Sequence, residues 1–261
     1  FAGHPGWFWM FMIEGLLAVV AGVIVFWYLD NSPDTARFLN SNEKQILKYK
    51  LQSEEQVKIH STLLGALRNI QVWHLALIYM TIQISVYGLI FFLPTQVAEL
   101  LGEKVGFKAS IVAALPWIAA LLGTYYIPRY SDRTGQRVPL VIFTLILAGL
   151  GITCSAVFNP LFSIIALCFA AIGCIAVQPI FWTIPTQMLT GTALAGGIGF
   201  INMFGAFGGF LAPIIRVKAE LLFNNQIAGL ALIGSVAFIG TICVLLLPVT
   251  QTKKTNHHLM N

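Results

Sequence analysis

Three polar side chains, Tyr79, Gln83 and Tyr87, recur at four-residue intervals within a long apolar stretch. On a helix this spacing places all three on one face. Phenol and amide groups donate and accept hydrogen bonds without a full charge to desolvate, so they suit the hydroxyl groups of a polyhydroxylated solute. The face therefore predicts one wall of a polar, solute-binding cavity.

Two further apolar stretches carry polar side chains of the same kind. Gln178 and Trp182 are four residues apart with Pro179 between them, and Asn202 lies among several glycines. A proline bends a helix because it removes a backbone hydrogen bond. We predict that these residues line the same cavity. The alternative is hydrogen bonding between helices for Gln83, Gln178 and Asn202, and close helix packing for the glycines.

The elements that position these residues belong to a membrane protein. Hydrophobic residues make up 57% of the 261 residues and charged residues 10%, with a mean hydropathy of +0.82. A soluble domain averages about 25% charged residues. A soluble fold could not cover its core with so few charges, so lipid must contact most of the surface. The net charge of +5 comes from basic loops, which argues against nucleic-acid binding.

Seven apolar segments are long enough to cross a bilayer as helices, which takes about 20 residues. They cover residues 7–28, 70–94, 108–128, 138–158, 161–184, 192–215 and 226–248. With the 29–69 connector on the cytoplasmic side, eleven Lys and Arg residues lie inside and four outside, as the positive-inside rule requires. This orientation starts the chain outside and ends it inside, with Arg216 to Glu220 along the outer interface.

Ionisable side chains are rare within these segments. Glu14 lies in the first one, where a carboxyl group is costly and can carry protons, unless it reaches the interface. We expect no cation inside the spans. The sequence has no GxSxG, HExxH, P-loop or SxxK motif, and its four cysteines form no CxxC pair. We therefore expect no enzyme activity, no cofactor and no metal site.

The connector between the first two spans holds eleven of the charged residues. Asn40 precedes an amphipathic run from Ser41 to Gln56, and Glu43 is placed as its capping-box partner. We predict a short helix that lies under the membrane, with a solvated loop as the alternative for its second half. Because the chain begins at Phe1 and not at a methionine, we expect it to be part of a longer protein.

A short polar stretch resembles a known family motif. Tyr130-Ser-Asp-Arg-Thr-Gly-Gln-Arg137 is similar to the cytoplasmic motif of the major facilitator superfamily, with Pro128 in place of the family's glycine. In that family the motif acts as a conformational latch between helix ends. The resemblance implies this role for Asp132, Arg133, Gly135 and Arg137.

Other stretches resemble one branch of that family, the anion:cation symporters. They are Gly6 to Gly15, Asp30 to Leu39, Tyr87 to Pro94, Pro179 to Pro185 and Leu189 to Ala193. Phe8 stands where the branch often has an arginine, and Ala206 where it often has a second polar residue. Within the branch, the chain is most similar to bacterial transporters of sugar acids such as L-rhamnonate.

The resemblance implies an all-α integral membrane protein whose family has twelve helices in two six-helix bundles, with the solute between them. The seven transmembrane helices of this chain would be helices six to twelve. Residues 1–29 would form the last helix of the first bundle, 30–69 the cytoplasmic central loop, 70–249 the second bundle and 250–261 a cytoplasmic tail. The rest of the first bundle would be required for activity.

The implied function is proton-coupled symport of an organic anion, such as a sugar acid, across the bacterial inner membrane by alternating access. The residues that would bind this substrate are Gln178, Trp182, Asn202, Tyr87 and Gln83. The implied partners are the anion, protons and the lipid bilayer. Two alternatives remain open, a seven-helix receptor or sensor and a truncated transporter without activity.

Overall fold

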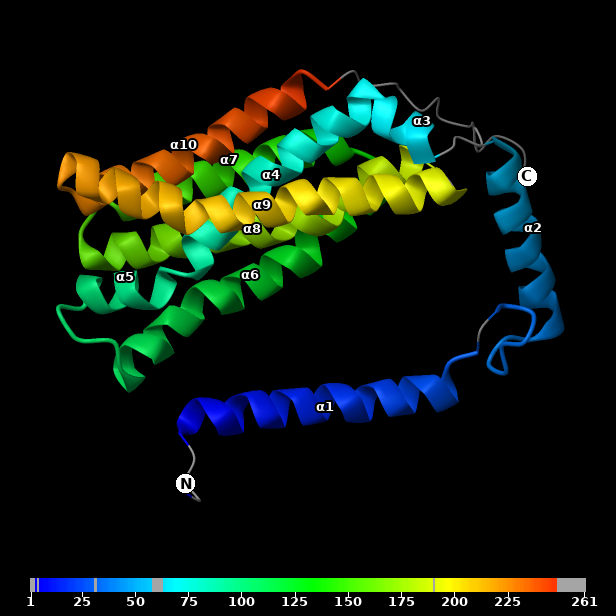
Figure 1. Cartoon of the computed structure of the whole chain (residues 1–261), viewed down its shortest axis with the longest axis horizontal. Coiled ribbons are helices and arrows are strands. Elements are labelled where there is room, and N and C mark those ends of the chain that lie inside the picture. Colours follow the sequence, from blue (N-terminus) through cyan, green and yellow to red (C-terminus); the bar gives the residue numbers. More distant parts are fainter. Residues whose placement is uncertain (1–2, 4, 31, 58–62, 190, 248–261) are drawn as a thin grey trace. The chain divides into compact units, whose positions relative to one another are not determined.

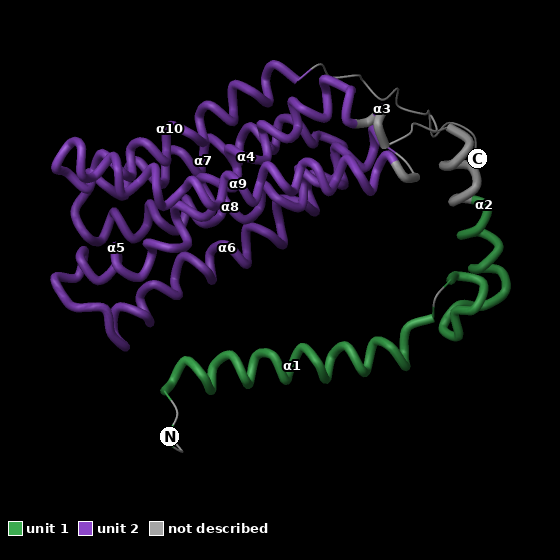
Figure 2. The backbone as a smooth tube through the Cα atoms, in the orientation of Figure 1, with its two compact units in different colours: residues 1–59 green, residues 60–261 purple. Residues whose placement is uncertain are grey.

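The computed structural model describes residues 3, 5–30, 32–57, 63–189 and 191–247, and within these ranges every regular element is a helix (Figure 1). The predicted tail at 250–261 lies outside the described residues. The chain divides into two compact units, residues 1–59 and residues 60–261 (Figure 2).

The first unit holds two helices. Helix α1 (Gly6–Tyr28) has no buried residue. Helix α2 (Ser41–Val57) begins with the predicted capping box. The Asn40 N–H donates to Glu43 Oε2 and the Glu43 N–H donates to Asn40 Oδ1, both at 2.9 Å. The helix continues to Val57, so the alternative of a loop in its second half is wrong.

The second unit is a bundle of six long helices with two short ones. The helices are α3 (Leu63–Arg68), α4 (Ile70–Ile90), α5 (Leu93–Leu100), α6 (Phe107–Thr134), α7 (Arg137–Ser155), α8 (Pro160–Met188), α9 (Gly191–Phe223) and α10 (Gln226–Leu245). Helix α4 packs against α8, α9 and α10, and it is the most buried of the membrane-spanning helices. Helix α8 packs between α6 and α7, and α7 also packs against α10.

The core of this bundle comes from several helices at once. Leu75 on α4, Leu145 on α7, Leu167 and Phe181 on α8, and Ile233 on α10 are all at most 1% exposed. Between α7 and α8 the backbones meet directly, because a Cβ added to Gly151 would lie 2.7 Å from the Ala166 carbonyl oxygen. Small residues that bring helix backbones together are typical of membrane bundles.

Seven described helices are long and apolar enough to span a membrane, which confirms the seven predicted spans. Several of their ends differ from the prediction. The second span ends at Ile90 and is followed by α5, because Pro94 lacks an N–H and its ring would clash with the Ile90 carbonyl in a continuous helix. Helix α6 runs on to Thr134, and α9 runs on to Phe223.

Candidate functional site

The predicted polar face of α4 lies against glycines of α9. A Cβ added to Gly205 would lie 3.1 Å from Gln83 Cγ and would also meet the ring of Tyr79. A Cβ added to Gly209 would lie 2.7 Å from Tyr87 Cδ2. The close-packing interpretation of these two glycines is therefore confirmed. The absent side chains leave space on α9 for the larger polar side chains of α4.

Tyr79 connects this face to α8. Its ring stacks on Phe181 with centroids 5.1 Å apart and planes at 16°, and it meets Trp182 edge-on at 4.7 Å. Tyr79 and Phe181 are buried, whereas Trp182 is half-buried. The three rings form an aromatic wall between α4 and α8. Tyr79 belongs to the polar face predicted from the sequence, but it is not among the five residues expected to bind the substrate.

Gln83 carries a buried acceptor without a partner. The side chain is half-buried, yet its Oε1 is inaccessible to solvent and accepts no hydrogen bond from any described residue. A buried amide oxygen without a donor is costly by about 1–3 kcal/mol. Gln96 Oε1 and Thr124 Oγ1 are unpartnered in the same way among the described residues, so this feature alone does not identify a binding site. Gln83 differs from these two residues because it shares a helix face with Tyr79 and Tyr87, which makes it a candidate to accept a hydroxyl donor.

The remaining predicted binding residues make fewer contacts with the α4 face and the aromatic wall. Tyr87 is half-buried and its ring lies 5.4 Å from that of Phe91, at the end of α4. Gln178 is half-buried on α8, one turn before Trp182, and Asn202 is exposed on α9. Within the described ranges, no hydrogen bond joins Gln178 or Asn202 to the α4 face. The structure brings the α4 residues and Trp182 together and leaves these two amides on the flanking helices.

Arg216 corrects one expectation from the sequence. Because α9 continues to Phe223, Arg216 lies within a membrane-spanning helix, where no cation was expected. The residue is 5% exposed, and its Nε donates to Glu220 Oε1 at 2.9 Å. The expected segment along the outer interface is therefore part of a packed helix. The apolar span was placed too short because helix formation continues past the point where the sequence becomes polar.

The motif residues lie at a helix junction and not in an extended loop. Helix α6 includes Asp132 and Arg133, and Gly135 ends it in the left-handed conformation at φ 70°. Asp132 and Arg133 are exposed, and no ion pair joins either of them to another described residue. Arg137 in the first turn of α7 donates from Nη1 to the Thr183 carbonyl oxygen of α8 at 3.3 Å. The motif therefore contacts α8 next to Trp182.

Glu14 lies in the N-terminal half of α1 and is exposed within the first unit. No residue of α1 is buried in that unit. A carboxyl group on a helix that spans a membrane needs a protein partner or a water path. The position is compatible with the predicted proton-carrying role, which stays a prediction.

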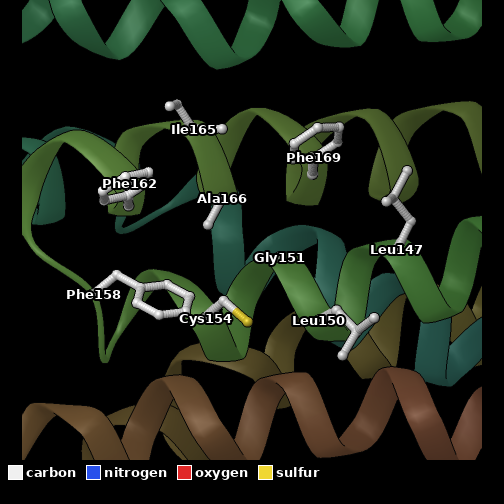
Figure 3. Close-up of a pocket in the computed structure, with 9 residues that line it drawn as sticks. All are labelled: Leu147, Leu150, Gly151, Cys154, Phe158, Phe162, Ile165, Ala166 and Phe169. Carbon is white, nitrogen blue, oxygen red and sulfur yellow. The ribbon is translucent and has the colours of Figure 1, made fainter.

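An apolar groove of about 260 Å³ lies apart from these residues, between α7 and α8 (Figure 3). It is lined by Leu147, Leu150, Gly151, Cys154, Phe158, Phe162, Ile165, Ala166 and Phe169. None of these side chains can orient a hydroxylated solute by strong hydrogen bonds. The groove is therefore not the predicted polar cavity.

The chain is similar in sequence to known membrane transport proteins. The family described as Major Facilitator Superfamily matches residues 1–213. The chain is 62% identical over 252 residues to inner membrane transport protein RhmT of Escherichia coli (strain K12), covering 97% of this chain and 59% of that protein. It is 33% identical to a putative tartrate transporter of Agrobacterium vitis and 32% identical to a quinolone resistance transporter of Acinetobacter baumannii. These two alignments cover 96% and 92% of this chain, and 58% and 56% of the relatives. The chain thus spans less than two thirds of the length of the relatives it matches.

Proposed function

The chain belongs to the major facilitator superfamily, and on this premise we propose that it is the larger part of a secondary transporter for an organic anion. We propose further that the anion is a sugar acid such as L-rhamnonate, carried with protons by alternating access across a bacterial inner membrane. Residues 1–29 would then complete a first bundle, and residues 70–249 would form the second one, with a cytoplasmic C-terminus.

The observation that carries the proposal is the unpartnered Oε1 of Gln83. Gln83 lies on a helix face shared with Tyr79 and Tyr87, and the ring of Tyr79 meets that of Trp182. A hydroxyl of the solute would donate to Gln83 Oε1, while the indole of Trp182 would cover an apolar face of the carbon chain. Gln178, Asn202 and Tyr87 would supply further hydrogen bonds from α8, α9 and α4.

The charges in the second unit indicate where the carboxylate would bind. Among the described residues of that unit, the buried cation is Arg216, and it is already paired with Glu220 and the Gly88 carbonyl. The described binding face itself carries neutral polar groups. We therefore propose that the carboxylate is held by the first bundle, and that Glu14 is a candidate to carry the coupling proton.

The name of one relative supports this chemistry. Tartrate, in the name of the Agrobacterium vitis relative, is a hydroxylated acid, as a sugar acid is. The family match also weighs against the seven-helix receptor, because it extends over 213 residues including the motif at the end of α6. We expect the 261-residue chain alone to be inactive, since one bundle provides only one wall of the cavity.

A chimera tests the proposal. The part of the E. coli relative that this chain does not match would be joined ahead of Phe1, and uptake of labelled L-rhamnonate would be measured in cells that lack the relative. We expect uptake that hydroxylated acids compete for and that hexanoate does not. Uptake of an unrelated solute alone, by a chimera present in the membrane, would overturn the substrate. Uptake that persists after a protonophore collapses the proton gradient would overturn proton coupling.

A further inference from the structure

Arg216 occupies a junction of three helices that the proposed function does not use. Its Nη1 donates to the Gly88 carbonyl oxygen of α4 at 3.3 Å, and its guanidinium carbon lies 4.1 Å from the centroid of the Phe92 ring. Its Nε is bound to Glu220, with only 6% of the arginine side chain exposed. A buried arginine with these contacts has a defined position, because its planar guanidinium holds several N–H donors in a fixed geometry.

The bond to Gly88 satisfies a carbonyl that the end of α4 leaves without a helical partner. In a continuous helix the Phe92 N–H would donate to Gly88, but here it donates to the Leu89 carbonyl at 3.3 Å. Unsatisfied backbone groups are costly within a membrane, so the break after Ile90 needs a donor. Arg216 supplies it, with a positive charge at the C-terminus of a helix, where the helix dipole favours a cation.

Helix α10 leaves room for the ion pair. A Cβ added to Gly229 would lie 2.6 Å from Glu220 Oε1 and 3.0 Å from Arg216 Cγ. The pair therefore packs directly on the α10 backbone. The guanidinium of Arg216 contacts the end of α4 and Phe92, while its stem and Glu220 contact α10, and these contacts restrict the last turn of α4.

Tyr87 lies in that last turn, next to Gly88. Its ring is packed against Gly209, two turns before Arg216 on α9. We infer that Arg216 is a positioning residue, which holds the last turn of α4 so that Tyr87 points into the solute-binding face. This inference rests on the proposed function for its effect on transport. Its effect on the position of Tyr87 is independent of that function.

The test uses the chimera in a cysteine-free background. Tyr87→Cys would report the position of the last turn of α4 through its rate of labelling by a membrane-permeant maleimide. Leu77→Cys, on the same helix and 45% exposed, is the control position. Arg216→Met removes the guanidinium, and Arg216→Lys keeps a positive charge without the planar guanidinium group. Lys218→Met removes an exposed cation from α9, the helix that carries Arg216.

We expect Arg216→Met to change labelling at position 87 about tenfold, the factor that one charge-assisted hydrogen bond represents. Arg216→Lys should give an intermediate rate, and Lys218→Met should give the parental rate. Unchanged labelling at position 87 in a folded Arg216→Met protein would overturn the inference. An equal change at position 77 would also overturn it, since it would show general loosening of the bundle.

Transport kinetics, measured in a chimera that keeps the native Tyr87, test the role of Arg216 independently of labelling. In a chimera that takes up sugar acid, Arg216→Met should raise KM about tenfold, with a smaller change in the maximal rate, because binding geometry is disturbed first. Loss of maximal rate with an unchanged KM would contradict a positioning role. If the parental chimera transports no sugar acid, the proposed function fails while the labelling result still decides the role of Arg216.

Discussion

Tyr79 of α4 stacks on Phe181 of α8, with ring centroids 5.1 Å apart and an interplanar angle of 16°. These residues are separated by about a hundred positions in the chain, yet both are buried and their rings meet face to face. The stack holds Trp182 edge-on to Tyr79. The stack therefore determines the orientation of the aromatic wall in the proposed site.

Gln83→Leu should raise KM for the sugar acid about tenfold in the chimera, because it removes the unpartnered acceptor while conserving approximate volume. Gln71→Leu, at the other end of α4, is the matched control and should leave KM unchanged. Initial uptake rates over a range of concentrations measure both values. An equal effect of the two changes would rule out a specific role for Gln83.

Trp182→Ala should weaken solute binding more than Trp182→Phe, because phenylalanine keeps an apolar ring against the substrate. A double-mutant cycle with Tyr79→Leu should show a coupling of about 0.5–1.5 kcal/mol in stability, as an edge-to-face ring contact provides. Trp117→Ala on α6, whose ring contacts no other ring in the described part of the chain, is the control. Additive effects of Trp182→Ala and Tyr79→Leu would contradict the contact.

Gly205→Ala should destabilise the bundle by about 1–3 kcal/mol, since the added methyl group would overlap the Tyr79 ring and approach Gln83 Cγ. Gly199→Ala is the control on the same helix, because a Cβ there meets nothing within 4 Å. It should be neutral or stabilise the helix by up to about 1 kcal/mol. Thermal unfolding of the purified proteins in detergent compares them, and equal melting temperatures would refute the close contact.

Gly135→Ala should lower the free energy of unfolding by about 1–2 kcal/mol. Residue 135 has a φ of 70°, and the Cβ of an alanine in that conformation clashes with its own backbone. Gly135→Asn should lower the free energy of unfolding by less than Gly135→Ala, since asparagine tolerates this conformation. Gly106→Ala is the control, because Gly106 is extended at φ −166° and any residue adopts that conformation. Unfolding measurements in which alanine at 135 and alanine at 106 behave alike would show that the left-handed end of α6 is not required.

The sequence alone predicted the elements whose cause is local. The seven spans follow from the length of their apolar runs, and the cap of α2 follows from Asn40 and Glu43 three residues apart. The shared face of Tyr79, Gln83 and Tyr87 follows from helical periodicity. Each of these depends on residues within one helix, so neighbours in the sequence contain the necessary information.

Only the tertiary structure determines which helices pack against those faces. In a membrane helix both the lipid side and the protein side are apolar, so hydrophobic periodicity does not tell which side packs. The contact of Tyr79 with Phe181, the glycines of α9 beneath Gln83, and the burial of Arg216 against Gly88 all depend on helices distant in sequence. The polar residues that could bind a solute are therefore evident from the sequence, whereas the packing that presents Gln83 as an unpartnered acceptor exists only in the folded bundle.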